Sequence, residues 1–303
     1  MKILITGASG LVGSEIVLKA EKSLSGGKQA TSCEKLRISQ IHRVTMSPHE
    51  NCSPADLTTE EGIKVVESLD FDVIVHSAAW RDPERCLKNQ EGALKLNYES
   101  TQKIAKIAAA RKARMIYMST DYVFSGINPP YAEDAEPSPV NHYGRTKLLG
   151  EQAVMETTAN FAILRIPLQY GLAVRIEQCP MLLTTLKALK SEKKWPMDDH
   201  IVRYPTYSGD VADAVMLILA KSLRGIYHFT GQDKTTKYGM TLTIGKALGM
   251  KTDHIVPFQD PPAGEEARPR DSHLSIGKIL KEGLPLPLPF EERIRRLSNL
   301  IIR

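Results

Sequence analysis

The stretch TGASGLVG, residues 6–13, places three glycines three residues apart, at Gly7, Gly10 and Gly13. It directly follows the apolar run KILIT, which is typical of a buried strand, and it opens a segment with helical periodicity. In this setting Gly7 permits a tight turn, Gly10 lets the backbone approach a pyrophosphate, and Gly13 lets the helix pack closely on the strand. The helix N-terminus then offers free N–H groups to phosphates. The stretch therefore predicts a dinucleotide-binding loop, against the alternative of a glycine-rich turn without a ligand.

Strand-like and helical segments alternate beyond this loop. The further strand candidates are residues 71–79, 113–120, 161–167, 225–231 and 254–258, with two weak ones around 35–39 and 41–46. The helical candidates are residues 59–69, 89–112, a segment beginning near Tyr143, about 178–191, 209–221 and 236–249. A long loop rich in proline and glycine is expected at 124–141, and a proline-punctuated tail ends the chain. Such alternation indicates βαβ units and a parallel sheet.

We therefore expect an α/β fold, with a Rossmann-type doubly wound parallel sheet and a smaller C-terminal α/β substrate-binding lobe. Residues 1–166 are predicted to form the NAD(P)-binding domain and residues 167–303 mainly the lobe. Residues from about 205 to 232 are expected to return to the first domain. The path of residues 22–54, which are mostly polar, is not predicted.

Composition and charge exclude several classes of protein. Of 303 residues, 42% are hydrophobic and 25% are charged, which is ordinary globular composition. The net charge of +5 is too dilute for a nucleic-acid interface, although it suits an anionic small molecule. The four cysteines match no metal-ligand spacing, no apolar stretch approaches a membrane span, and the N-terminal apolar run is too short for a signal peptide. We expect a cytoplasmic protein that binds no metal, nucleic acid or membrane.

A second motif, NHYGRTKLLGE at residues 141–151, places Tyr143 and Lys147 four residues apart in a predicted helix. Residues at this spacing share a helix face. A lysine ammonium beside a phenol favours the phenolate and lowers its pKa, which makes tyrosine a usable general acid near neutral pH. The spacing alone is common, so the alternative is an ordinary solvated face. The motifs around the pair decide between the two.

Five motifs occur in an order that resembles the extended short-chain dehydrogenase/reductase family. They are TGASGLVG at 6–13, ADLTT around Asp56, HSAA at 76–79, STDYVFSG at 119–126 and YGRTK at 143–147. Within that family STDYVF, NPPYAEDAEPSPVNHYGRTKLLGE and ARPRDSHLS resemble the dTDP-4-dehydrorhamnose reductase branch. Together with LRIPLQYG, RYPTYSGDVA and YHFTGQDKTTKYGM, they are still more similar to the regulatory beta subunits of methionine adenosyltransferase, which share that branch's fold. The resemblance covers nearly the whole chain and is weakest from about 22 to 54.

The resemblance implies roles for the residues in these motifs. Tyr143 would protonate the alkoxide that forms when a nicotinamide reduces a ketone, Thr120 would hydrogen-bond the same oxygen, and Lys147 would hold the nicotinamide ribose. The implied catalytic residues are thus Thr120, Tyr143 and Lys147. The implied cofactor-binding residues are Gly7, Ser9, Gly10, Leu11, Val12, Gly13, Asp56, Leu57, Ala78, Ala79, Tyr143, Lys147 and Pro167.

The substrate side departs from the reductase branch. That branch carries a substrate-contacting tryptophan where this chain reads Ile166-Pro167-Leu168. Trp80 and Arg81 are candidates to replace it, although Trp80 packing between the lobes is an equal alternative. Arg268 and Arg270 are candidates to bind a diphosphate, against the alternative of an exposed basic turn. The expected substrate residues are Trp80, Arg81, Asp121, Tyr122, Arg268 and Arg270.

The choice of cofactor depends on the end of the second strand. An acid there would bind the adenosine ribose hydroxyls and favour NAD, whereas basic or small polar residues admit a 2′-phosphate. The candidates at this position are Arg37, Ser39, His42, Arg43 and Ser47. None of them is acidic, so we expect NADP(H), with NAD(H) as the alternative.

Three functions remain open from the sequence. The first is an NADP(H)-dependent reductase of a 4-keto sugar nucleotide. The second is a cofactor-binding regulatory subunit, similar to the methionine adenosyltransferase beta subunit. The expected assembly is a complex with a methionine adenosyltransferase catalytic subunit or, alternatively, a homodimer. The third is another extended-family epimerase or dehydratase, and the dehydratase is disfavoured because Thr120 is followed by Asp121-Tyr122 where a dehydratase would carry an acid pair.

Overall fold

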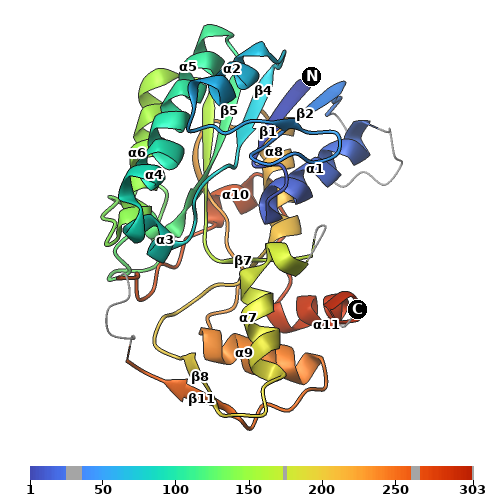
Figure 1. The fold of residues 1–303 in the computed structure, drawn as a ribbon, viewed down its shortest axis with the longest axis vertical. Coiled ribbons are helices and arrows are strands. Elements are labelled where there is room, and N and C mark those ends of the chain that lie inside the picture. Colours follow the sequence, from blue (N-terminus) through green and yellow to red (C-terminus); the bar gives the residue numbers. More distant parts are fainter. Residues whose placement is uncertain (25–35, 173–175, 261–266, 302–303) are drawn as a thin grey trace.

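A seven-stranded sheet forms the upper part of the molecule in Figure 1. The computed structural model describes residues 1–24, 36–172, 176–260 and 267–301. The strands, in order across the sheet, are β3 (Ser53–Pro54), β2 (Gln40–Thr45), β1 (Lys2–Thr6), β4 (Val73–His76), β5 (Arg114–Thr120), β6 (Phe161–Ile166) and β10 (Gly225–His228). All six pairings are parallel. The strand order reverses between β1 and β4, which is where doubly wound sheets bind their ligands.

Helices cover both faces of this sheet (Figure 1). One face carries α1 (Leu11–Leu24), α8 (Ser208–Ala220) and α10 (Gly277–Lys281), whose apolar side chains join one core cluster with the strands. The other face carries α2 (Glu60–Ser68), α5 (Ser100–Ala110) and α6 (His142–Thr157), which share a second cluster. Two buried faces explain why the central strands read as continuous apolar runs. The expected Rossmann-type α/β fold is confirmed.

The segment predicted as one long helix over 89–112 is a helix interrupted by one π-helical turn. It consists of α4 (Gln90–Leu94), a π-helical turn η1 (Lys95–Glu99) and α5. A π-helical turn adds a residue to the helix and is frequent at functional sites. Here it turns Asn97, which is fully buried, toward the loop that follows β4.

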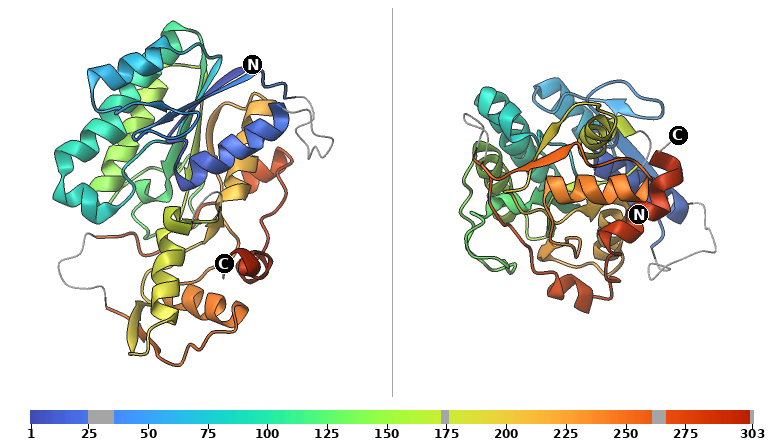
Figure 2. Two further views of the ribbon diagram at one scale, coloured as in Figure 1. Left: turned by 45° about the vertical axis from the view of Figure 1, so that its right-hand side comes forward. Right: turned by 90° about the horizontal axis from the view of Figure 1, so that it is seen from below.

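A smaller lobe lies below the carboxyl edge of the sheet (Figures 1 and 2). Its elements are α7 (Pro180–Leu189), β8 (Trp195–Asp198), α9 (Lys237–Ala247), β11 (Ile255–Phe258) and α11 (Phe290–Ile301). A short parallel pair, β7 (Gln169–Tyr170) with β9 (Thr206–Tyr207), lies between the lobe and the sheet. The lobe's core cluster includes Leu11 at the start of α1, so the glycine loop packs against the lobe.

The structure departs from two sequence expectations. Among the described residues of the weak region, 22–54, two strands form, β2 and the short β3. The described residues of the candidate 35–39 are not in a strand, and residue 35 lies outside the described residues. The tail contains two helices, α10 and α11, that its prolines concealed. The long loop at 124–141 is held down, since Tyr131 N–H donates to His273 O at 2.8 Å and Ser138 N–H donates to Val123 O at 2.8 Å.

Within the described ranges, the helices are all too short or too polar to cross a bilayer.

Candidate functional site

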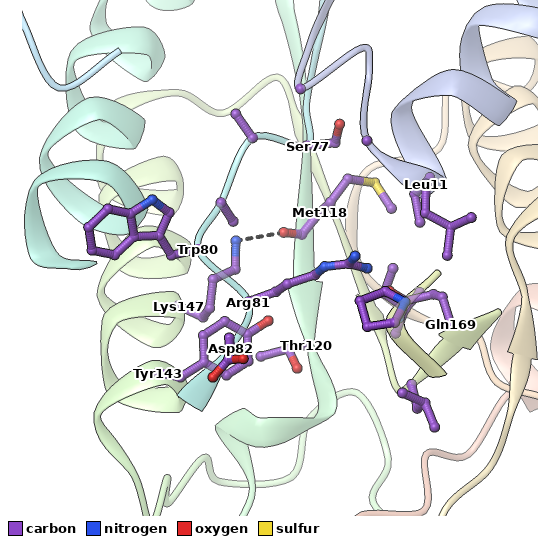
Figure 3. Close-up of a pocket in the computed structure, with 18 of the residues that line it drawn as sticks. Leu11, Ser77, Trp80, Arg81, Asp82, Met118, Thr120, Tyr143, Lys147 and Gln169 are labelled. Atoms are coloured by element: carbon purple, nitrogen blue, oxygen red, sulfur yellow. Dashed lines mark hydrogen bonds between the residues drawn. The ribbon is translucent and has the colours of Figure 1, made fainter. Parts of the chain in front are cut away.

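A cavity of about 640 Å³ lies between the carboxyl edge of the sheet and the lobe. Figure 3 shows side chains from both parts pointing into it. All thirteen cofactor-binding residues predicted from the sequence line this cavity, as do the three predicted catalytic residues. The sequence therefore identified residues from six separate segments that the fold brings together.

The glycine loop forms one wall. Gly7 has a φ of 64°, in the left-handed region, and a Cβ there would lie 2.8 Å from Ala78 N. A Cβ on Gly13 would overlap Gly7 O, whereas a Cβ on Gly10 would meet only that oxygen, at 3.2 Å, and would lie beside the cavity. Gly7 and Gly13 are thus required by the protein itself, while Gly10 leaves room for a ligand. The first residues of α1, Leu11 to Gly13, line the same cavity.

The end of β2 forms the outer part of the cavity. Thr45 and Met46 line it together with Asp56, whose Oδ1 accepts hydrogen bonds from the N–H and the hydroxyl of Thr58. Among the described lining residues, the five candidates Arg37, Ser39, His42, Arg43 and Ser47 are absent. Arg43 instead pairs with Glu21 of α1. The sequence reasoning missed Thr45 and Met46 because it did not locate the strand's end.

Thr120, Tyr143 and Lys147 meet at the inner end of the cavity (Figure 3). Thr120 ends β5 and caps the short 3-10 helix η2 (Asp121–Val123), accepting the Tyr122 N–H at 3.2 Å. The other two lie on α6, which Asn141 caps by accepting the Gly144 N–H at 2.8 Å. Lys147 is 2% exposed, and its Nζ donates to Met118 O at 2.8 Å. A strand end and a helix face thus position three polar groups without exposing them.

Burial dominates the protonation of this group. It lowers the pKa of Lys147 to about 7, opposed by the charge of Glu151 one turn along α6. Burial also raises the pKa of Tyr143, and its hydrogen bond with Thr120 only partly offsets that rise. The expected lowering of the Tyr143 pKa by Lys147 is not met in this structure, because removal of water sets the direction of the shift and Thr120 is the group that opposes it.

Asp121 directly follows Thr120 at the end of β5. It is buried, Thr120 Oγ1 donates to its Oδ1 at 3.1 Å, and Ser272 Oγ donates to its Oδ2. Burial raises the pKa of Asp121 to about 6, with Ser272 and Arg203 opposing the rise. Tyr122, also predicted for the substrate side, contacts Tyr143 edge to face at 5.7 Å between ring centroids. Both residues line the cavity.

Trp80 lines the cavity but turns its indole toward the helices (Figure 3). The main-chain N–H of Trp80 donates to Asn97 Oδ1 at 2.9 Å, and Asn97 Nδ2 donates to Trp80 O at 2.9 Å. The Arg85 guanidinium stacks on the indole, with Cζ 3.8 Å from the ring centroid. Trp80 therefore serves packing as well as lining, and Arg85 is a cation that sequence reasoning missed.

The pair Arg268 and Arg270 is separated. Arg268 lines the cavity and lies 3.4 Å from Glu84, whereas Arg270 is exposed and is not among the described lining residues. The backbone of Arg270 is held by Val202, whose N–H donates to Arg270 O at 2.8 Å. The expectation that both arginines face one ligand is therefore wrong for Arg270. Further lining residues that the sequence did not reveal are Arg203, Lys237, Met181, Met197 and Met240, because the lobe folds them in from distant segments.

His76 is the last residue of β4. Its Nδ1 lies 2.7 Å from Thr6 Oγ1 and its Nε2 lies 3.1 Å from Thr101 Oγ1. Across the described residues, no three His, Cys, Asp or Glu side chains gather as metal ligands.

Comparisons with known proteins agree with this geometry. The chain is 34% identical over 300 residues to methionine adenosyltransferase 2 subunit beta of Rattus norvegicus, covering 97% of this chain and 86% of that protein. Its structure matches a dTDP-4-dehydrorhamnose reductase from Bacillus anthracis in complex with NADP with a TM-score of 0.80, at 24% identity over 97% of this chain and 96% of that one. A dTDP-4-dehydrorhamnose reductase ortholog from Clostridium acetobutylicum matches with a TM-score of 0.81, at 23% identity over 100% of both chains.

The resemblance drawn from the sequence is thereby confirmed, both to the reductase branch and to the beta subunits. The family described as the RmlD substrate binding domain matches residues 1–301. Because this match spans both the sheet and the lobe, the chain belongs to the RmlD substrate binding domain family.

Proposed function

We propose that this protein is an NADP(H)-dependent reductase of a keto sugar nucleotide. The observation that carries the proposal is that one cavity joins the glycine loop to Thr120, Tyr143 and Lys147. A nicotinamide dinucleotide bound there supplies the hydride. Each of these three residues then has one role in the reduction of a ketone.

Tyr143 gives its hydroxyl proton to the carbonyl oxygen as that oxygen gains negative charge, and solvent later returns a proton to the phenolate. Thr120 holds the same oxygen by a hydrogen bond. Lys147 binds the ribose hydroxyls and, when charged, stabilises the phenolate that forms. The dry surroundings of the three side chains strengthen each of these interactions.

The room beside Gly10 and the free N-terminus of α1 support binding of a dinucleotide. The end of β2 supports the choice of NADP(H), because Thr45 and Met46 bring no carboxylate that would repel a 2′-phosphate. NAD(H) is the alternative, and a direct comparison of the two affinities decides between them.

The test is oxidation of NADPH by the purified protein with a dTDP-4-keto-6-deoxyhexose. Tyr143→Phe should abolish turnover while it keeps NADPH binding. Tyr98→Phe, which changes a tyrosine of η1 that is not among the described cavity-lining residues, is the matched control and should turn over normally. Turnover that survives in Tyr143→Phe contradicts the assigned role, and no turnover by the wild-type protein with any keto sugar nucleotide contradicts the reductase.

A second candidate function is regulation of a methionine adenosyltransferase catalytic subunit. It is favoured by the 34% identity to a beta subunit over nearly the whole chain. In this case the cavity binds a dinucleotide without reducing a ketone. A change in the activity of a purified catalytic subunit that Tyr143→Phe leaves unaltered would support regulation, whereas no change with either protein would exclude it.

A further inference from the structure

The hydroxyl group of Thr120 already has a full set of hydrogen bonds. A hydroxyl group has one proton to donate and two lone pairs that accept. Thr120 Oγ1 donates to Asp121 Oδ1 at 3.1 Å and accepts the main-chain N–H of Tyr122 at 3.2 Å. Its second lone pair is left for the hydroxyl of Tyr143, with which Thr120 also forms a hydrogen bond. While Asp121 accepts the Thr120 proton, Thr120 has no proton to give to the oxygen of a ketone.

Asp121 is the acceptor that keeps the Thr120 hydroxyl in this direction. Its side chain is 5% exposed, and its Oδ2 accepts from the hydroxyl of Ser272. The charged and titratable groups that face it come from three elements, and they are Arg203 ahead of β9, Tyr122 of η2 and Tyr143 of α6. Arg203 and Ser272 favour the carboxylate, whereas burial disfavours it and raises the pKa of Asp121 to about 6. Both forms of Asp121 are therefore populated near neutral pH.

A proton on Asp121 reverses the order of donors and acceptors. The carboxylic O–H then donates to Thr120 Oγ1, which frees the proton of Thr120 to turn into the cavity that both residues line. Asp121 and Tyr122 now fill both lone pairs of Thr120, so the Tyr143 hydroxyl is also released. Two donors thereby become available to one ketone oxygen. The loss of one such donor to a developing oxyanion costs about 100- to 1000-fold in rate.

We propose that Asp121 is a positioning residue for ketone reduction, because it directs the hydroxyl of Thr120, which donates to the ketone oxygen when Asp121 carries a proton. The inference rests on the proposed reductase. It gives Asp121 a role through Thr120 in place of a direct contact with the substrate. The added proton comes from solvent and stays on Asp121 during the reaction, while Tyr143 remains the general acid.

The experiment measures kcat/KM for a dTDP-4-keto-6-deoxyhexose with saturating NADPH at several values between pH 5 and pH 7, corrected for the decay of NADPH alone. It compares wild type with Asp121→Asn, Ser272→Ala and Asp134→Asn. The asparagine amide offers Thr120 an N–H at every pH, as the protonated carboxyl group does. Asp134 is exposed and is not among the described cavity-lining residues, so Asp134→Asn is the matched control.

Wild type and Asp134→Asn should lose roughly tenfold or more in kcat/KM from pH 5 to pH 7, because the protonated fraction of Asp121 falls by about that factor. Asp121→Asn should keep its value at pH 5 to within about twofold, the change that Lys147, with its pKa of about 7, adds in every variant. Ser272→Ala removes a hydrogen bond that favours the carboxylate, so its fall should move to higher pH by roughly one unit.

A profile of Asp121→Asn that falls as steeply as that of wild type overturns the inference. A folded Asp121→Asn protein without turnover at any pH also overturns it, in favour of a direct contact with the substrate. If Asp121→Asn does not fold, an unmoved profile of Ser272→Ala overturns it instead. A wild-type protein that reduces no keto sugar nucleotide overturns the proposed function and this role together, whereas an active wild type with a level profile overturns the role alone.

Discussion

Lys147 directs its ammonium to the main-chain oxygen of Met118, 2.8 Å away, and thereby ties α6 to the end of β5. The same ammonium lies 4.0 Å from the centroid of the Tyr117 ring. A carbonyl and an aromatic face compensate only part of the hydration that the charge has lost, so burial lowers the pKa of Lys147 to about 7. At neutral pH the charged and the neutral form of Lys147 are therefore both populated.

Lys147→Met should therefore stabilise the protein most at low pH. The pKa of Lys147 is about 7 in the folded state against 10.5 as its ordinary value, so between these values the unfolded chain binds more protons. Burial of Lys147 therefore destabilises the folded state fully below pH 7, and this penalty decreases as the pH rises from 7 to 10.5. We expect Lys147→Met to raise the free energy of unfolding by a few kcal/mol at pH 6. Urea unfolding at pH 6, 8 and 10 checks this, and a variant no more stable than wild type at pH 6 contradicts it.

Asp121→Asn tests a group whose contribution to stability changes with pH in the opposite direction to that of Lys147. Burial raises the pKa of Asp121 to about 6, so the folded state binds more protons than the unfolded chain between about pH 4 and pH 6. The stability from this group is present below that window and is lost as pH rises through it. An asparagine keeps an acceptor for Ser272 and offers an N–H to Thr120. We expect a gain of about 1–3 kcal/mol at pH 7.5 and none at pH 4. Thermal melts at both values decide it, and an equal gain at both pH values would assign the effect to packing.

Short-range sequence patterns were enough to predict most of the fold and much of the candidate site. Glycine spacing and an apolar run are enough to predict the first βα unit, and the four-residue spacing of Tyr143 and Lys147 places both on one face of α6. The C-terminal helix α11 also left a signal, since Glu291 pairs with Arg295 and Glu292 with Arg296 four residues on, but the prolines before it masked that signal.

Long-range packing decided what the sequence could not. The end of β2 was missed because only Val44 and Thr45 of that strand are buried, which leaves no clear alternation. Arg268 and Arg270 are two residues apart, yet the fold brings one into the cavity and leaves the other in solvent. The direction of the Tyr143 pKa shift depends on burial by the whole domain, which no local motif records.

Arg165→Met should destabilise the protein strongly. Arg165 and Glu151 are both buried, and the guanidinium binds the carboxylate through two bonds, at 2.9 Å and 2.7 Å. Removal of the arginine leaves a buried carboxylate with Ser119 as a neutral donor, and we expect a loss of about 3–5 kcal/mol. The double variant Glu151→Leu with Arg165→Met should recover most of that loss, because it also removes the carboxylate that the single variant leaves unpaired. Urea unfolding of the three proteins tests the pair. A double variant as unstable as the single one would show that the charge is not the cause.

Gly10 and Gly13 should respond differently to the same methyl group. A Cβ on Gly13 would overlap Gly7 O, so Gly13→Ala has to move the turn and should cost more than about 2 kcal/mol of stability. A Cβ on Gly10 meets Gly7 O at 3.2 Å and otherwise faces the cavity. Gly10→Ala should therefore change the free energy of unfolding by less than about 1 kcal/mol.

Gly10→Ala should nonetheless weaken the binding of NADPH by tenfold or more, on the order of 1.4 kcal/mol, because the methyl group occupies the space where the phosphates approach the backbone. Melting temperatures and NADPH titrations of both variants separate the two effects. A stable Gly10→Ala protein that binds NADPH as tightly as wild type would mean that no dinucleotide approaches this loop.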